Sequence, residues 1–205
     1  MDDKTGPHRK NHFIQTGRIL IVRIIGGSRR GKKLHRPRDL SIRPTADRVR
    51  ESIFNIIQHR VPGAYVLDLF AGTGAMGLEA LSRGAEQTVF IDNHPAALTL
   101  IKKNVRACRW ETRARIIRWD ITRELGCIRF PKVLYDLVFI DPPYLKNLAP
   151  RALEHLDRSL ALAKEARVVV EHDRADSIDI DSTAFVLEDQ RAYGKTLVSF
   201  LRYVI

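Results

Sequence analysis

Residues 65–83 read YVLDLFAGTGAMGLEALSR and decide the fold class of this 205-residue chain. The apolar run 65–70 predicts a short strand, the segment Gly72-Thr73-Gly74-Ala75-Met76-Gly77 predicts a tight turn, and a helix follows to about Arg83. Parallel sheets with covering helices are built from units of this order. We therefore expect an α/β protein.

The alternation of strands and helices continues on both sides of this unit. A helix that opens at Pro44-Thr45 and ends at Pro62-Gly63 precedes it. After the unit we expect strands at 87–91, 115–117, 135–140 and 168–170, and helices at 95–107 and 149–163. Two consecutive strands, 184–188 and 196–205, suggest one antiparallel member. The pattern predicts a mostly parallel sheet with helices on both faces.

The charge of the chain is concentrated near its start. The formal net charge is +11, and residues 1–50 carry 14 Lys and Arg against 4 Asp and Glu, whereas residues 51–205 carry 21 against 20. A basic arm on a near-neutral domain favours a polyanionic partner such as nucleic acid. We divide the chain into a flexible basic tail (1–17), a basic hairpin or loop extension (18–43) and an α/β domain (44–205).

Composition excludes several classes of protein. No run of 18 apolar residues occurs, the first residues lack the apolar core of a secretory signal, and the 2 cysteines cannot form a disulfide framework. The 7 histidines show no metal-ligand spacing, so we expect no metal site. These features favour a cytoplasmic protein, and since nothing in the sequence requires an oligomer, we expect a monomer.

The glycine-rich turn has two interpretations. Gly72, Gly74 and Gly77 fit the G-x-G-x-x-G pattern of NAD-binding turns, and Asp92 ends the next strand near the usual ribose position. Asp68, however, lies inside the first strand, where a carboxylate would repel a pyrophosphate but accept a hydrogen bond from an ammonium group. S-adenosylmethionine carries such a group, so the pattern favours this cofactor over NAD and over a turn without a ligand. The predicted cofactor-binding residues are Asp68, Phe70, Ala71, Gly72, Thr73, Gly74, Asp92, Asn93, Asp120 and Ile121.

Asp120 follows the third predicted strand, and its role has two explanations. It accepts a hydrogen bond from the adenine amine of the cofactor, or it caps a helix that begins at Ile121-Thr122.

The segment Asp141-Pro142-Pro143-Tyr144 follows the most apolar predicted strand. Two prolines stiffen the backbone and remove two amide donors, which leaves a carboxylate and carbonyl oxygens beside an aromatic ring. Such acceptors hold a planar NH2 group while the ring stacks on the base. We predict Asp141, Pro142, Pro143 and Tyr144 as catalytic residues that align an exocyclic amine for methyl transfer. The proton released by transfer passes to Asp141 or to water.

In these residues the chain resembles the bacterial 16S ribosomal RNA guanine-N2 methyltransferases of the guanine-966 type. The resemblance extends from residue 22 to about 205, is strongest over 22–92 and is weak over 172–190. It is carried by Arg23-Ile24-Ile25-Gly26-Gly27, Gly31-Lys32-Lys33-Leu34, Arg43-Pro44-Thr45-Ala46-Asp47-Arg48-Val49-Arg50-Glu51, Phe54-Asn55, the segment 67–85 and Asp141 to Tyr144. Asp92 stands where Glu is common in the family, and Tyr144 where Phe also occurs.

The resemblance implies the class I methyltransferase fold, a Rossmann-like sheet of seven strands with the last pair reversed. It also implies transfer of a methyl group from S-adenosylmethionine to the N2 amine of a guanine in 16S rRNA. The expected substrate is 16S rRNA in one of three forms: free RNA, RNA within the small subunit, or RNA within an assembly intermediate. A base inside a duplex could not reach Tyr144, so the target guanine must be unpaired or flipped out.

The basic extension is expected to bind RNA phosphates. A second basic stretch, 102–118, flanks the same groove or forms an ordinary solvated face, and Trp110 and Trp119 are expected to pack in the domain. The predicted RNA-binding residues are Arg23, Arg29, Arg30, Lys32, Lys33, Arg43, Thr45, Arg48 and Arg50.

Two other functions remain as alternatives. A DNA adenine-N6 methyltransferase would use the same Asp-Pro-Pro-Tyr segment, but the residues after Tyr144 leave no room for a separate DNA-recognition domain. A non-catalytic RNA-binding protein with this fold would have no need of the intact acids and glycines.

Overall fold

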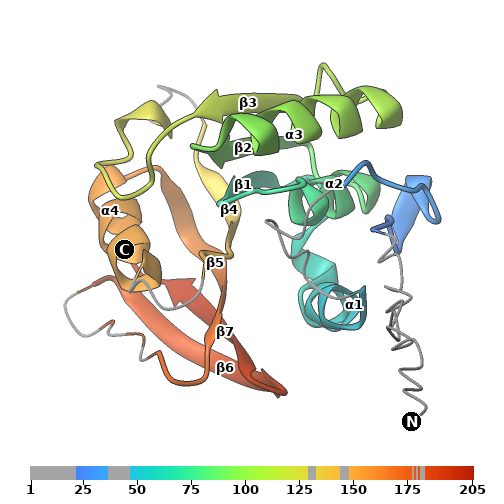
Figure 1. Ribbon diagram of the computed structural model, residues 1–205. Coiled ribbons are helices and arrows are strands. Elements are labelled where there is room, and N and C mark those ends of the chain that lie inside the picture. Colours follow the sequence, from blue (N-terminus) through green and yellow to red (C-terminus); the bar gives the residue numbers. More distant parts are fainter. Residues whose placement is uncertain are drawn as a thin grey trace, which may run out of the picture.

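Seven strands of the described chain form one sheet in the order β3-β2-β1-β4-β5-β7-β6 (Figure 1). The structure, a computed structural model, describes residues 22–36, 47–128, 133–143, 148–176, 178, 180 and 183–205. The strands are β1 Tyr65–Leu69, β2 Gln87–Asp92, β3 Ala114–Arg118, β4 Tyr135–Ile140, β5 Leu162–Asp173, β6 Phe185–Tyr193 and β7 Thr196–Tyr203. The helices are α1 Asp47–Ile56, α2 Ala75–Ser82, α3 Pro95–Cys108 and α4 Leu148–Ser159, with short 3-10 turns at Gly27–Arg29, Gln58–Arg60 and Gly126–Ile128.

The strand directions confirm a mostly parallel sheet with one antiparallel member. β1 to β5 pair in parallel, whereas β7 is antiparallel to both β5 and β6. β7 lies between β5 and β6, so the last two strands exchange their order in space.

Helices cover both faces of the sheet, which explains the near-continuous apolar runs of its central strands. Val66 and Phe139 point toward α1 and α2, whereas Leu67 and Val138 point toward α4. α2 lies close to the sheet because Gly77 has no side chain, and a Cβ atom there would come within 2.4 Å of the Phe90 ring.

The boundary between α4 and β5 differs from the sequence prediction. We expected a helix to residue 163 and a strand only at 168–170, but α4 ends at Ser159 and β5 begins at Leu162. Leu160 has a φ of +52°, which an α-helix does not allow, and the Ser159 hydroxyl accepts the N–H of Ala161. The register of β5 against β4 shifts near the start of β5. The alternation of buried and exposed side chains along β5 is therefore irregular and hard to predict from sequence.

Residues 22–36 form a small hairpin that lies against α2 and α3 (Figure 1). Arg23 pairs with Lys33 in an isolated antiparallel bridge, and further backbone hydrogen bonds join Ile24 to Lys32 and Leu34 to Val22. Val22, Ile24 and Leu34 are buried, whereas Arg23 and Lys33 are exposed. The alternation directs one side of the hairpin into the protein and its charges outward.

Within the described part of the chain, no helix has the length and apolar character needed to cross a membrane. No group of three or more potential metal-ligating side chains occurs there.

Candidate active site at the carboxyl edge of the sheet

The carboxyl ends of β1, β2 and β4 lie side by side. Leu69 at the end of β1 pairs with Ile91 of β2 and with Ile140 of β4. The backbone N–H of Ala71 donates to Ile91 O at 3.0 Å, and that of Asp141 donates to Leu69 O at 3.5 Å. The glycine turn, the acid of β2 and the Asp-Pro-Pro segment therefore share one edge of the sheet, where open α/β sheets bind their ligands.

The glycine turn joins β1 to α2 through a left-handed backbone. Phe70, Gly72 and Gly74 have φ angles of +59°, +55° and +77°. The N–H of Gly74 donates to Ala71 O at 2.7 Å and closes the turn directly before α2, which begins at Ala75. A glycine at position 74 adopts this conformation without the strain that a side chain would impose.

Asp68 lies beneath the turn and is only 2% exposed. Its Oδ2 atom accepts the N–H of Gly77 at 2.9 Å. Burial raises the pKa of the Asp68 carboxyl to about 8; the Gly77 hydrogen bond opposes this shift and the nearby Asp92 adds to it. A cation placed beside this carboxyl would favour its charged form.

Asp92 ties the end of β2 to the glycine turn. Its Oδ2 atom accepts the N–H of Gly72 at 2.9 Å, and its Oδ1 atom accepts the N–H of His94 at 2.8 Å. Asn93, next to it, is exposed. The carboxylate lies where the sequence predicts a ribose-binding acid, and that role stays a prediction.

Asp120 stabilises a local turn after β3. Its Oδ1 atom accepts both the N–H and the hydroxyl of Thr122, at 3.0 Å and 2.7 Å. The Thr122 hydroxyl and then its N–H lower the pKa of the Asp120 carboxyl. Residues 121–122 form a turn, so the expected helix at Ile121-Thr122 is wrong, and contact with adenine stays a prediction.

The Asp-Pro-Pro segment follows β4 directly. Asp141 is partly buried, Pro142 is buried and Pro143 is exposed. Tyr144 lies outside the described residues, as do Arg43 and Thr45 among the predicted RNA-binding residues.

The hairpin presents most of the predicted phosphate-binding side chains. Arg29, Arg30, Lys32 and Lys33 are exposed, as is Arg48 on α1. Arg23 is exposed as well, but its Nε atom donates to Asp47 Oδ2 at 3.0 Å.

Arg50 is a correction to the sequence prediction. Its side chain is 0% exposed and its Nη2 atom donates to Arg23 O at 2.6 Å and to Asp47 Oδ1 at 2.9 Å. Glu79 lies 3.9 Å from its Nε atom. Because the guanidinium is enclosed by the protein's own acceptors, Arg50 has no surface to offer a phosphate, and it braces α1 against the hairpin.

Glu79 of α2 is a residue that the sequence interpretation missed. It is fully buried and its two oxygens accept the N–H groups of Ile25 at 2.7 Å and Gly26 at 2.8 Å. Arg83 donates to the same carboxylate at 2.7 Å. The signal was an acid in the apolar stretch Met76-Gly77-Leu78-Glu79-Ala80-Leu81, where a charge needs buried partners.

Asn104 of α3 was missed in the same way. Its Oδ1 atom accepts the N–H of His35 at 2.6 Å, and its Nδ2 atom donates to His35 O at 3.0 Å and to Thr73 O at 2.9 Å. One buried amide thus joins the end of the hairpin to the glycine turn. The signal was a polar residue on the apolar stripe that contains Ile101 and Val105.

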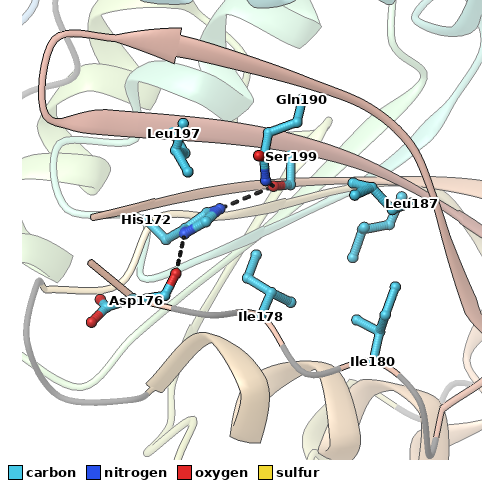
Figure 2. Close-up of a pocket in the computed structure, with 9 residues that line it drawn as sticks. His172, Asp176, Ile178, Ile180, Leu187, Gln190, Leu197 and Ser199 are labelled. Atoms are coloured by element: carbon cyan, nitrogen blue, oxygen red, sulfur yellow. Dashed lines mark hydrogen bonds between the residues drawn. The ribbon is translucent and has the colours of Figure 1, made fainter. Parts of the chain in front are cut away.

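A separate cavity of about 220 Å³ lies between the last three strands and Asp176, Ile178 and Ile180 (Figure 2). His172 contacts Ser199 Oγ at 2.9 Å and Asp176 O at 3.1 Å, and Gln190 donates to Ser199 Oγ at 2.8 Å. Ile178 and four leucine and isoleucine neighbours supply the remaining walls. None of the predicted site residues lines this cavity.

Comparisons with known proteins agree with one another. The sequence pattern of the family described as conserved hypothetical protein 95 matches residues 22–202. YlbH of Bacillus subtilis, provisionally named an rRNA methyltransferase, is 34% identical over 181 residues, which are 88% of this chain and 98% of that protein. Ribosomal RNA small subunit methyltransferase D of Escherichia coli is 34% identical over 174 residues, 85% of this chain and 86% of its own.

A solved structure shows the same fold. The Escherichia coli protein yhhF, provisionally titled a methyltransferase, superposes with a TM-score of 0.77 at 31% sequence identity. The superposition covers 90% of this chain and 99% of that one.

Proposed function

Because this chain belongs to the family described as conserved hypothetical protein 95, we propose that it is an S-adenosylmethionine-dependent methyltransferase of ribosomal RNA. The finer proposal is that it methylates the exocyclic N2 amine of a guanine in 16S rRNA. Relatives that carry rRNA methyltransferase names and cover most of the chain support the first statement. The Asp-Pro-Pro-Tyr segment and the family resemblance support the second.

One observation carries the proposal. Asp141 begins the Asp-Pro-Pro segment directly after β4, and its backbone N–H donates to Leu69 O, one residue before the glycine turn begins. A cofactor on the turn and an amine at Asp141 would therefore be neighbours, and placement of two reactants in this way contributes on the order of 7–11 kcal/mol in well-oriented systems.

The residues of the turn suit S-adenosylmethionine, which supplies a methyl group on a positively charged sulfur when it is bound. The buried carboxyl of Asp68 has a raised pKa, and a cationic ligand would offset the cost of its ionisation. Asp92 holds its carboxylate toward Gly72 at the same turn, where ribose hydroxyls could replace one of its backbone donors.

The residues around the target amine would align it for methyl transfer, and none of them would act as a nucleophile. The Asp141 carboxylate and the carbonyl oxygens of the segment accept the two N–H groups, and the prolines leave no N–H that would compete. Tyr144 stacks on the base in this proposal. The amine nitrogen is thereby aimed toward the turn, and the proton released by transfer passes to Asp141 or to water.

The test is transfer of a labelled methyl group to 16S rRNA, both free and in assembled small subunits, followed by nucleoside analysis. We expect N2-methylguanosine, and we expect Asp141→Asn to reduce turnover at least 100-fold while S-adenosylmethionine still binds. Asp136→Asn is the matched control, because Asp136 lies at the opposite end of β4 and accepts the N–H of Tyr65.

Other products would decide between the alternatives. N6-methyladenine in DNA would replace the proposal with the DNA enzyme. Binding of S-adenosylmethionine and RNA without transfer to any nucleic acid would favour the non-catalytic protein.

A further inference from the structure

Two segments of the chain carry basic residues and no acidic ones. Residues 22–36, the hairpin, contain 6 Lys and Arg, and residues 95–110, which comprise α3 and its end, contain 4, with no Asp or Glu in either. The two segments are separated by 58 residues, so the sequence alone does not show whether their charges act together.

The structure places the hairpin directly against α3. Asn104 bonds to both backbone groups of His35, and Val22, Ile24 and Leu34 pack in one cluster with Ile101 and Cys108 of α3. Burial raises the pKa of the Cys108 thiol, and the charges of Lys32 and Arg29 oppose the shift.

The charged side chains of both segments point to solvent. Arg29, Arg30, Lys32 and Lys33 of the hairpin are exposed. α3 buries Ile101, Asn104, Val105 and Cys108 toward the protein and exposes Lys102, Lys103, Arg106 and, just after it, Arg109. Of the acids near these segments, Glu79 is buried, Asp47 pairs with Arg23 of the hairpin, and Glu111, which follows α3 in the chain, is exposed.

Hydrogen bonds to α2 hold the backbone of the hairpin in place. Glu79 accepts two backbone N–H groups of the hairpin, and Ser82 accepts the N–H of Arg29 at 2.9 Å and donates to Gly26 O at 2.6 Å. A backbone that is already ordered loses less conformational entropy when a ligand binds than a mobile loop would.

We propose that the hairpin and α3 form a single phosphate-binding surface for the RNA backbone. This inference rests on the proposed function for the identity of the nucleic acid, and it assigns to α3 a role in binding. The turn of the hairpin, around Gly26 and Arg29, is anchored at Ser82 at the C-terminal end of α2, and an eight-residue helix places that end about 12 Å from the glycine turn. The surface therefore holds nucleotides that flank the target guanine.

The test compares two triple variants that remove equal charge from different places. Lys102→Gln, Lys103→Gln and Arg106→Gln change α3, whereas Arg60→Gln, Arg158→Gln and Lys164→Gln change exposed side chains near the amino ends of β1 and β5. Binding to a 16S rRNA fragment is measured from 0.05 to 0.3 M salt. We expect the α3 variant to bind about 10- to 100-fold more weakly near 0.15 M and its salt slope to fall by about two units.

The control variant should bind RNA as the wild type does, and both should keep wild-type affinity for S-adenosylmethionine. Lys103→Gln alone should reduce the slope by about 0.7. Equal weakening by both triple variants, or no effect of the α3 variant, would overturn the inference even if wild-type protein methylates rRNA. A larger effect on duplex DNA than on RNA would overturn the choice of RNA. If the wild-type protein does not methylate rRNA but the α3 variant still binds RNA more weakly than the control variant, only the proposed function is contradicted.

Discussion

The carboxyl group of Asp68 has two partners of different kinds. In the protein it accepts the N–H of Gly77, which holds α2 at the end of β1. In the proposed complex it also faces a cationic ligand. The N–H of Gly77 can donate to a neutral or a charged oxygen, whereas a cationic ligand requires a carboxylate. Substitution of Asp68 by the isosteric Asn therefore separates its role in the fold from its role in cofactor binding.

Asp68→Asn should abolish a pH dependence of stability that the wild type shows. In the wild type the carboxyl ionises near pH 4 when unfolded and at about 8 when folded, so its stabilising contribution is complete below pH 4 and is lost as pH rises to about 8. The loss is about 1.4 kcal/mol for each unit of pKa difference. Urea unfolding at pH 5 to 8.5 measures the slope.

The Asn variant retains an oxygen for Gly77 and should be about as stable as the wild type near pH 4 and more stable than the wild type near pH 8, yet it should bind S-adenosylmethionine at least tenfold more weakly. Equal pH slopes in both proteins would show that Asp68 does not keep its proton in the fold. Unchanged affinity would remove it from the cofactor site.

Arg50 shows where residue type alone misleads. Arg48 and Arg50 belong to the same basic segment, but Arg48 is exposed and Arg50 is fully buried among Asp47, Glu79 and Arg23 O. Burial lowers the pKa of the Arg50 guanidinium, and Asp47 and then Glu79 oppose the shift. Its partners come from three elements, so only the folded chain distinguishes the two arginines.

At the scale of elements, α3 connects the two functional regions. Its buried stripe packs on the sheet, and Asn104 within that stripe bonds to the hairpin on one side and to the glycine turn on the other. The side-chain amide of Asn104 bonds to the N–H and C=O of His35, as the backbone of a neighbouring strand would in a sheet.

Asn104→Leu should destabilise the protein by about 2–3 kcal/mol, because it leaves His35 and Thr73 O without their buried partners. The amide of His35 should exchange its hydrogen faster than in the wild type, and both RNA and S-adenosylmethionine should bind more weakly. Thr99→Ala is the matched control, since Thr99 is an exposed residue of α3 whose hydroxyl donates to Pro95 O at 2.9 Å within the same helix. A stable variant with slow exchange at His35 would contradict this role of Asn104.

Strands, helices and their order were mostly predictable, whereas some ends of elements were not. The sequence of residues 65–83 predicted β1, the turn and α2, because apolar runs and glycines determine the backbone conformation of the residues next to them. The end of α4 at Ser159 depends on Leu160 adopting a positive φ, and a leucine carries no signal for that conformation.

At the scale of the whole molecule, charge and chemistry occupy different regions. The turn of the hairpin bonds to Ser82 at the C-terminal end of α2, whereas the acids Asp68, Asp92 and Asp141 lie at the carboxyl ends of β1, β2 and β4. RNA would therefore bind across the molecule, with its backbone at one end and its reacting base at the other.

The two ligands should consequently differ in their response to salt. We expect RNA affinity to fall with a slope of about −3 to −4 in a plot of log affinity against log salt, as for four to six single-strand phosphate contacts. S-adenosylmethionine affinity should change less than threefold over the same range, because Asp68 is buried and poorly screened. Titrations of each ligand from 0.05 to 0.3 M salt measure both slopes. A flat RNA titration would show that contacts other than phosphates dominate.

The sequence by itself determined the α/β class, the order of its strands and helices, the acids at strand ends and the basic start of the chain. These features follow from composition and from periodicity over a few residues. Only the tertiary structure decided that Arg50 is buried and that Glu79 and Asn104 hold the hairpin. The physical reason is that burial and hydrogen-bond partnership depend on groups that are distant in sequence, such as His35 and Asn104, and become neighbours only when the chain folds.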